Sequence, residues 1–165
     1  MNRVYVLRDV AGQIVRAVKG IKHMRQNATF YTTADHGAAT EIYNGMRTQI
    51  ARILVEIRKL DTAAPEDRSN LWLDEEAENI EIDAKNSVRI VEALIREGRL
   101  DAAAATSFIN DSGYAYGAMR NLLGAARAYY IETDDAVAEV ERILALDEDE
   151  VGEVVAAAID QEETG

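Results

Sequence analysis

Hydrophobic residues recur every three or four positions through four long stretches of the chain. The four stripes are Leu7, Val10, Ile14, Ala17, Ile21, Met24, Ala28 and Tyr31; Tyr43, Met46, Ile50, Ile53, Ile57 and Leu60; Leu73, Ala77, Ile80, Ala84, Ser87, Val91 and Leu94; and Ala105, Phe108, Ser112, Ala115, Met119, Leu122, Ala126 and Tyr129. This spacing puts each set on one side of an α-helix, as in the seams of left-handed bundles. No stretch alternates with period two for long, so we expect no sheet.

Short breaks separate the four stripes. Asp61 to Asn70 contains the chain's single proline, Pro65, among polar residues, which is typical of a loop. Gly98 is typical of a residue that ends a helix, and Asp101, three residues later, is typical of the N-cap of the next helix. Short links make neighbouring helices antiparallel. Residues 1–131 are therefore predicted to be an all-α domain, an antiparallel up-down four-helix bundle.

Residues 132–165 carry two shorter stripes and form a separate C-terminal region. Its apolar residues are Val137, Val140, Ile143 and Leu144, and then Val151, Val154, Val155 and Ile159, with the acidic run Asp147–Glu150 between them. We expect one or two short C-terminal helices and an acidic tail. Short amphipathic helices need a surface to be stable in water, so they either pack on the flank of the bundle or dock on another subunit, giving a homo-oligomer, or on a partner.

The charge balance narrows the classes of partner. The 165 residues contain 18 Lys and Arg against 30 Asp and Glu, a formal net charge of −12. Because nucleic-acid binding depends on neutralising phosphates with Lys and Arg, DNA and RNA are not expected partners. There is no cysteine, which excludes thiolate chemistry and disulfides. No run of about eighteen apolar residues occurs, so we expect no direct membrane insertion. The absence of cysteine fits a reducing compartment.

Sequence motifs for catalysis are missing. The only histidines, His23 and His36, follow Gly20 and Thr33 by three residues, so the Glu-x-x-His pairs of di-iron bundles are absent. No phosphate-binding loop and no nucleophile with a plausible histidine base is found. We therefore expect no enzyme activity and no cofactor.

Polar residues near the middle of three of the predicted helices form one candidate site. They are Gln49, Asp83, Ser87, Asp111 and Ser112. A buried carboxylate is costly unless it is hydrogen-bonded or meets a cation. The layer is therefore either a metal or small-ligand site or a network that fixes the register of the helices, with the serines bonding to their own backbone.

A basic patch on the first predicted helix is the second candidate site. It contains Lys19, Lys22, His23 and Arg25, and it either receives an anion or an acidic partner or is an ordinary solvated face. Separately, three glycines inside the fourth helix, Gly113, Gly117 and Gly124, each cost about 1 kcal/mol relative to alanine, and close approach of a neighbouring helix would explain them.

Three stretches together resemble a known family. They are Val18-Lys-Gly-Ile-Lys-His-Met-Arg-Gln-Asn27, Ile42-Tyr-Asn-Gly-Met-Arg47 and Thr106-Ser-Phe-Ile-Asn-Asp-Ser-Gly-Tyr-Ala115. The chain resembles the cytoplasmic helical domain that follows the membrane region of bacterial and archaeal sodium/phosphate cotransporters, a domain related to PhoU. The resemblance covers roughly Ile14 to Leu146, and Asn110-Asp111-Ser112 is its strongest part.

The resemblance implies a non-enzymatic regulatory or interaction domain at the inner face of the cell membrane. Its partners would be the membrane segment of a phosphate transporter or the regulators of that transporter. PhoU-type proteins bind metal clusters through Glu/Asp-x-x-x-Asp motifs, but here Asn79 precedes Asp83 and Ser107 precedes Asp111 at that spacing. The alternative is a bundle that senses a metal ion or small ligand through the polar layer.

Overall fold

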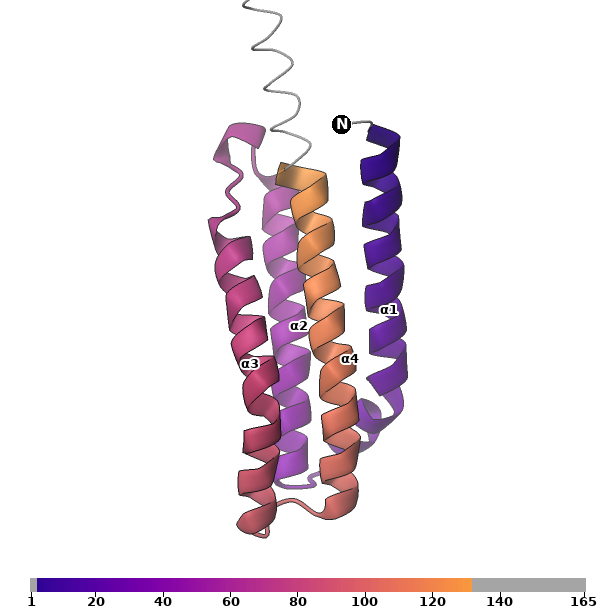
Figure 1. Cartoon of the computed structure of the whole chain (residues 1–165), viewed down its shortest axis with the longest axis vertical. Helices are drawn as coiled ribbons and strands as arrows, with labels where there is room; N and C mark the ends of the chain where they lie inside the picture. Colours follow the sequence, from indigo (N-terminus) through magenta and orange to yellow (C-terminus); the bar gives the residue numbers. More distant parts are fainter. Residues whose placement is uncertain (1–2, 132–165) are drawn as a thin grey trace, which may run out of the picture.

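The computed structural model describes residues 3–131, which form a four-helix bundle (Figure 1). The long helices are α1 (Arg3–Thr33), α2 (Ala38–Thr62), α3 (Leu71–Arg96) and α4 (Ala102–Ala126), with a 3-10 turn η1 (Pro65–Asp67) and a π-helical turn η2 (Arg127–Ile131). Successive helices alternate in direction, and this part of the chain contains no strand. The predicted fold is confirmed. The expected short C-terminal helices and homo-oligomer contact lie in residues 132–165, outside the described residues.

The link between α3 and α4 forms as its sequence predicts. Gly98 has a φ of 67°, a left-handed conformation that glycine adopts without strain. Three residues later the Asp101 carboxylate accepts a hydrogen bond of 2.8 Å from the backbone N–H of Ala104, so it caps the N-terminus of α4.

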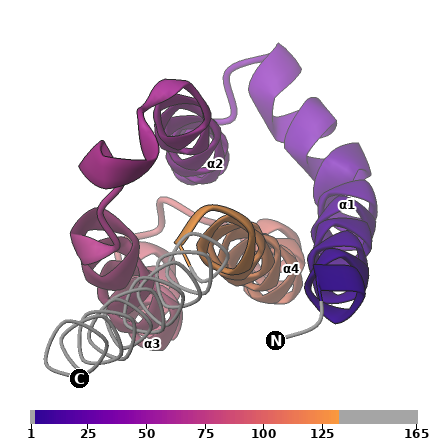
Figure 2. The same ribbon diagram turned by 90° about the horizontal axis from the view of Figure 1, so that it is seen from above.

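Helix α4 is the central element, with α1 and α3 on either side and α2 across from it (Figure 2). It contains many alanine and glycine residues, and twelve of its residues are buried. Small side chains let neighbouring helices come close. One close approach to a neighbouring backbone is at Gly20 of α1, where an added Cβ would lie 2.9 Å from the carbonyl oxygen of Tyr114.

The glycines singled out in the sequence have a different environment. A Cβ added at Gly113 or Gly117 would meet nothing within 4 Å, so the prediction that a helix approaches closely there is wrong. At Gly124 the neighbour is the flexible side chain of Gln13, which comes from α1. The glycine that a close helix contact requires is therefore Gly20, on the other helix of the pair.

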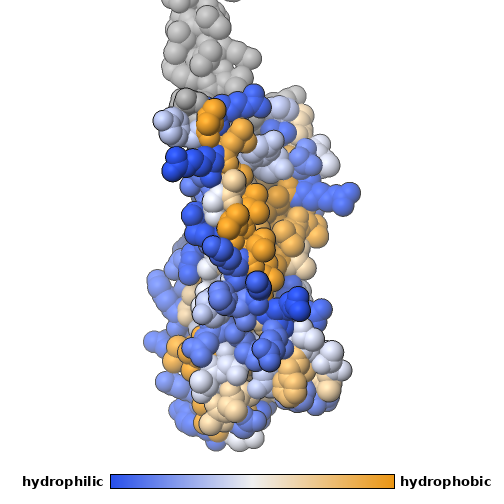
Figure 3. Space-filling model, turned by 90° about the vertical axis from the view of Figure 1, so that its right-hand side faces the viewer, coloured by the Kyte–Doolittle hydropathy of each residue, from blue (hydrophilic) through white to orange (hydrophobic). Residues whose placement is uncertain are grey.

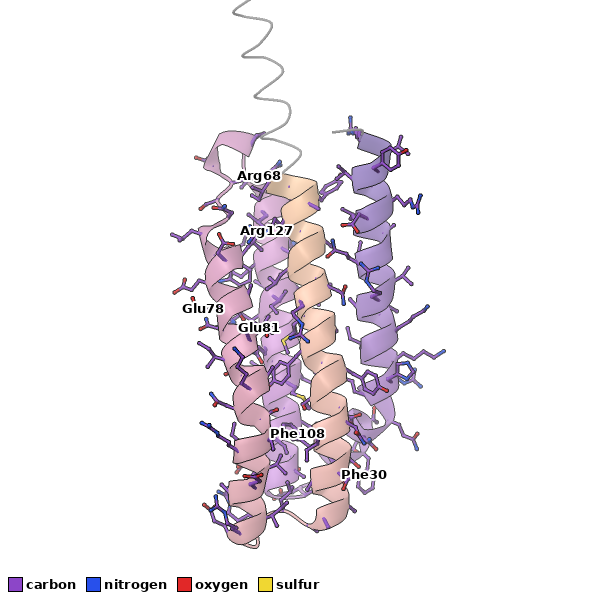
Figure 4. All side chains as sticks on the ribbon, viewed as in Figure 1. Phe30, Arg68, Glu78, Glu81, Phe108 and Arg127 are labelled. Atoms are coloured by element: carbon purple, nitrogen blue, oxygen red, sulfur yellow. The ribbon has the colours of Figure 1, made fainter. Side chains whose placement is uncertain are left out.

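The buried side chains form two separate clusters. The larger one fills the bundle and includes Tyr43, Ile53 and Met119, with Phe108 packed edge-to-face on Tyr43 at 6.1 Å between ring centroids (Figure 4). The smaller one joins the start of α1 to the end of α4 and η2, and consists of Val6, Val10, Ala125 and Ala128. At that end of the bundle, α1 is therefore held by contacts with the end of α4 and with η2.

The buried stripe of α1 differs from the one expected from the sequence. The buried residues of this helix are Val6, Val10, Ala17, Gly20 and Met24. Leu7, Ile14 and Ile21 were expected in the core, but Leu7 and Ile14 are both 46% exposed and Ile21 is also at the surface. The prediction is wrong at these three positions because α1 is rotated, turning its narrower, small-residue stripe toward α4.

Ion pairs tie α3 to its neighbours. Arg120 of α4 contacts Glu81 at 2.8 Å, and Arg127 pairs with Asp74; Glu81 and Arg127 are labelled in Figure 4. These pairs are largely exposed, so each contributes little to stability. The pair of Arg52 in α2 with Glu76 is different because Glu76 is only 2% exposed, which makes the arginine its necessary counter-ion.

Candidate functional site

The structure divides the predicted polar layer between two places. Gln49 donates a hydrogen bond of 2.9 Å from Nε2 to Oδ2 of Asp83, near the surface between α2 and α3. Asp111 is instead buried, at 3% exposure, and its Oδ2 accepts hydrogen bonds from Asn27 Nδ2 at 3.0 Å and from the Tyr43 hydroxyl at 2.7 Å. The two carboxylates therefore have different partners.

The geometry of α2 separates these two groups along the bundle axis. Tyr43 and Gln49 are six residues apart, a rise of about 9 Å at 1.5 Å per residue. Ser87 and Ser112 each donate a hydrogen bond to a carbonyl of their own helix, Ala84 at 2.8 Å and Ile109 at 2.9 Å. Within residues 3–131, no group of three or more His, Asp or Glu side chains is arranged to hold a metal ion.

Buried Tyr43 has an altered acidity. Burial, and then the hydrogen bond to Asp111, raise the pKa of the Tyr43 hydroxyl above its usual value. Tyr43 thus stays protonated and donates to the carboxylate, while Asn27 of α1 supplies the second donor. Neutral donors from α1 and α2 therefore satisfy the Asp111 carboxylate of α4, and they fix how these three helices meet.

Gln49 and Asp83 line an open groove of about 540 Å³ between α2 and α3. Its wall also contains Arg52 and the ring of Tyr116. The pKa of Tyr116 is raised, first by burial and then by the nearby charge of Asp83. Polar residues from two helices therefore meet at a surface groove rather than in a closed site.

The predicted basic patch does not form a single site. Lys19 and Lys22 point to solvent, whereas the His23 ring stacks on Tyr114 of α4 with 4.8 Å between centroids. Arg25 lines the groove between α1 and α2. At 100° per residue, Arg25 lies about 160° around the helix from His23, so the four side chains cannot close on one small anion.

An exposed apolar stripe runs along the N-terminal two thirds of α1. It consists of Val4, Leu7, Ile14, Val18 and Ile21, with Ala11 in the same row. These residues are three or four positions apart, the spacing by which one helix packs against another. Figure 3 shows apolar surface gathered in the upper half of the face on which α1 lies. We call these residues the α1 stripe.

The α1 stripe continues into a groove between α1 and α2. This groove has a volume of about 820 Å³, and its wall contains Ile21, Met24 and Arg25 from α1 and Arg47, Ile50 and Leu54 from α2. The ribbons of α1 and α2 stand apart at the N-terminal end of α1 and approach each other near their connecting turn (Figures 1 and 2). We call this the α1/α2 groove, and it joins the stripe at Ile21.

Charge is divided unevenly along the chain. Residues 132–165 contain thirteen Asp and Glu residues and one Arg, so the net charge of −12 belongs to this segment and residues 1–131 are balanced. Helix α1 has six Lys and Arg residues against the single acidic residue Asp9. The face that carries the stripe is therefore on a cationic helix.

The hydrophobic spacing in the sequence did not separate the α1 stripe from the core. The spacing of its apolar residues was visible, but they were assigned to a single buried seam. The signal that could have revealed the stripe is the width of the apolar face of this helix. Two apolar rows lie side by side on it, and together they are wider than the surface that a single neighbouring helix can bury. The rows are Leu7, Ile14 and Ile21, and Val6, Val10 and Ala17.

No family model, curated protein or solved structure matches this chain. No helix within residues 3–131 is both long and apolar enough to cross a membrane.

Proposed function

We propose that this bundle is a regulatory interaction domain that binds an amphipathic helix along the α1 stripe and the α1/α2 groove. It acts by packing and release, without bond-making chemistry. The observation that carries the proposal is the exposed stripe of large apolar residues at helix-packing intervals on a helix whose other side is buried. Scattered exposed apolar residues need no explanation, whereas a contiguous row is typical of an interaction site.

The energy available on this face is appreciable. Its five large residues are between 36% and 68% exposed. Covering what remains of each contributes about 1 kcal/mol, or about 5 kcal/mol in all. Association of two separate molecules costs about 4–15 kcal/mol in lost motion, so the stripe needs help from the groove and from charge. Arg25 and Arg47 would favour a helix with carboxylates along its edges.

The resemblance to the cytoplasmic domain of sodium/phosphate cotransporters supplies the partner in this proposal. The stretch Val18–Asn27, part of that resemblance, lies partly on the α1 stripe and ends beside the α1/α2 groove. The bound helix would then belong to the cytoplasmic side of a phosphate transporter or to one of its regulators. Docking there would change the rate at which the transporter takes up phosphate.

Phosphate uptake with matched variants tests this proposal. In cells that lack the chain, sodium-dependent phosphate uptake should change, and the wild-type chain should restore it. The variant Ile14→Asp should fail to restore it while remaining folded, because Ile14 is exposed. The control Ile82→Asp, on α3 and equally exposed, should restore it fully. Equal restoration by both variants, or no change in uptake without the chain, would refute the proposal.

A second candidate function rests on the groove between α2 and α3. There Gln49 and Asp83 from two helices are hydrogen-bonded beside Arg52 and Tyr116, which suits a small polar ligand or a cation. Calorimetric titration with divalent cations and with phosphate is the test. Binding that is abolished by Asp83→Asn and unaffected by Asp74→Asn would support it, and no binding would exclude it.

A further inference from the structure

We infer that residues 132–165 of this same chain dock as an amphipathic helix on the α1 stripe and in the α1/α2 groove, and so compete with the partner. The inference rests on the proposed function, since the segment would occupy the same face. Three observations carry it: complementary charge, the position at which the chain leaves the bundle, and the length of chain that follows.

The chemistry of the segment complements the chemistry of the face. Residues 132–165 combine rows of Val, Ile and Leu with thirteen carboxylates and one arginine. The receiving helix α1 carries the apolar row together with six cations and one acidic residue. One of these cations, Arg16, faces α4, where its Nε donates a hydrogen bond to Asn121. Arg25 and Arg47 line the groove below the row. Apolar side chains would be covered while carboxylates meet these cations at the edges.

The described chain ends beside the start of the stripe. Ala125 and Ala128, in the last turns before Ile131, pack against Val6 and Val10 of α1. The side chains of Tyr129, Tyr130, Arg3 and Leu7 line one small pocket. The described chain therefore stops, at Ile131, beside the end of α1 where the stripe begins, the upper end in Figure 1.

The segment is long enough to cover the face. From Val4 to Ile21 is seventeen residues, about 26 Å along a helix, whereas thirty-four helical residues span about 50 Å. Enough chain is left for a reversal after Ile131 and for entry into the groove beyond Ile21. Docking within one chain also avoids most of the loss of motion that association of separate molecules entails.

A second copy of the chain fits this face less well. A symmetric pair that placed one α1 stripe on another would bring two cationic helices together. Lys19 and Lys22 are exposed on both copies, and like charges across an interface oppose binding. An acidic segment has the opposite effect on the same surface.

Paramagnetic broadening in the full chain tests the inference directly. The chain has no cysteine, so Val140→Cys or Val154→Cys provides a single site for a nitroxide. We expect loss of most amide signal intensity for residues 4–21 of α1 and around Leu54 of α2, and no loss at Ile82 and Ile90 of α3. At about 1 M salt, where the Debye length is about 3 Å, the loss should diminish.

Controls identify the occupant. Ile14→Asp should restore the α1 signals, whereas the equally exposed Ile82→Asp should leave the broadening unchanged. Mixing labelled chain with an isotope-enriched chain that has no nitroxide should give no broadening. Broadening in that mixture would mean that a second copy occupies the face, and broadening on α3 or nowhere would mean that the segment docks elsewhere or not at all; each of these results overturns the inference.

The two proposals can fail separately. If the broadening appears as expected but Ile14→Asp supports normal phosphate uptake, the docking stands and the proposed function falls. If the uptake experiment succeeds and no broadening reaches α1, the face binds a partner and the segment does not compete for it.

Discussion

Gly20→Ala is expected to destabilise the bundle by about 1 kcal/mol, although alanine forms helices better than glycine does. The new Cβ would lie 2.9 Å from the Tyr114 carbonyl oxygen and 3.4 Å from the Ala118 Cβ. The oxygen belongs to the backbone of α4, so it cannot move without the helix. Helix α1 would have to shift by several tenths of an ångström.

Two opposing terms set the size of this effect. Overpacking in a close contact lowers the free energy of unfolding by about 1–3 kcal/mol. Replacing a glycine inside a helix by alanine raises it by about 1 kcal/mol. Gly117 of α4 is the matched control because a Cβ there meets nothing within 4 Å. Only the favourable term applies to Gly117→Ala, which should stabilise the fold by about 0.5–1 kcal/mol.

Urea denaturation followed by circular dichroism measures both free energies of unfolding. The two variants should change stability in opposite directions and differ by about 2 kcal/mol. If Gly20→Ala stabilises the chain as much as Gly117→Ala does, α1 does not pack on α4 at this distance, and the reasoning about the α1 stripe loses its basis.

Three further predictions concern the core, each measured by urea denaturation. Ile53→Asp should unfold the bundle because Ile53 is fully buried, whereas Asp at its half-exposed neighbour Leu54 should change stability by less than about 1 kcal/mol; equal effects would contradict this orientation of α2. Asp111→Ala should cost about 2–4 kcal/mol, since it leaves the buried Tyr43 hydroxyl and the partly buried Asn27 amide without an acceptor. Asp83→Ala should cost less than about 1 kcal/mol. The pKa of Tyr43 is raised in the folded chain, so the contribution of Tyr43 to the free energy of unfolding is full below about pH 10 and declines above it. Tyr43→Phe should flatten that decline.

The fold was predictable because, in three of the four helices, the apolar residues predicted to face the core are the ones that are buried. In α2, α3 and α4 the expected residues Ile53, Ile80 and Met119 are fully buried. Helix α1 is the exception, since its apolar face is wide enough for two neighbours and spacing alone does not say which half is covered. The choice depends on Gly20, whose missing side chain only the three-dimensional contact explains.

The candidate sites were predictable in part for a similar reason. Asp111 was identified as a member of the polar layer, but its donors Asn27 and Tyr43 lie 84 and 68 residues away in sequence. No local pattern links such positions. The buried pairing of Glu76 with Arg52 likewise follows only from how α2 and α3 meet.

The close contact at Gly20 also explains why a docking face exists at all. Drawing α1 onto the backbone of α4 buries the row of Val6, Val10, Ala17 and Met24 and leaves the row of Leu7, Ile14 and Ile21 at the surface. A bulky residue at position 20 would favour a rotated α1, with the larger row inside. The small residue at the α1–α4 contact therefore sets both the packing of the bundle and the exposure of the stripe, and the Gly20 variant should weaken docking on the stripe as well as stability.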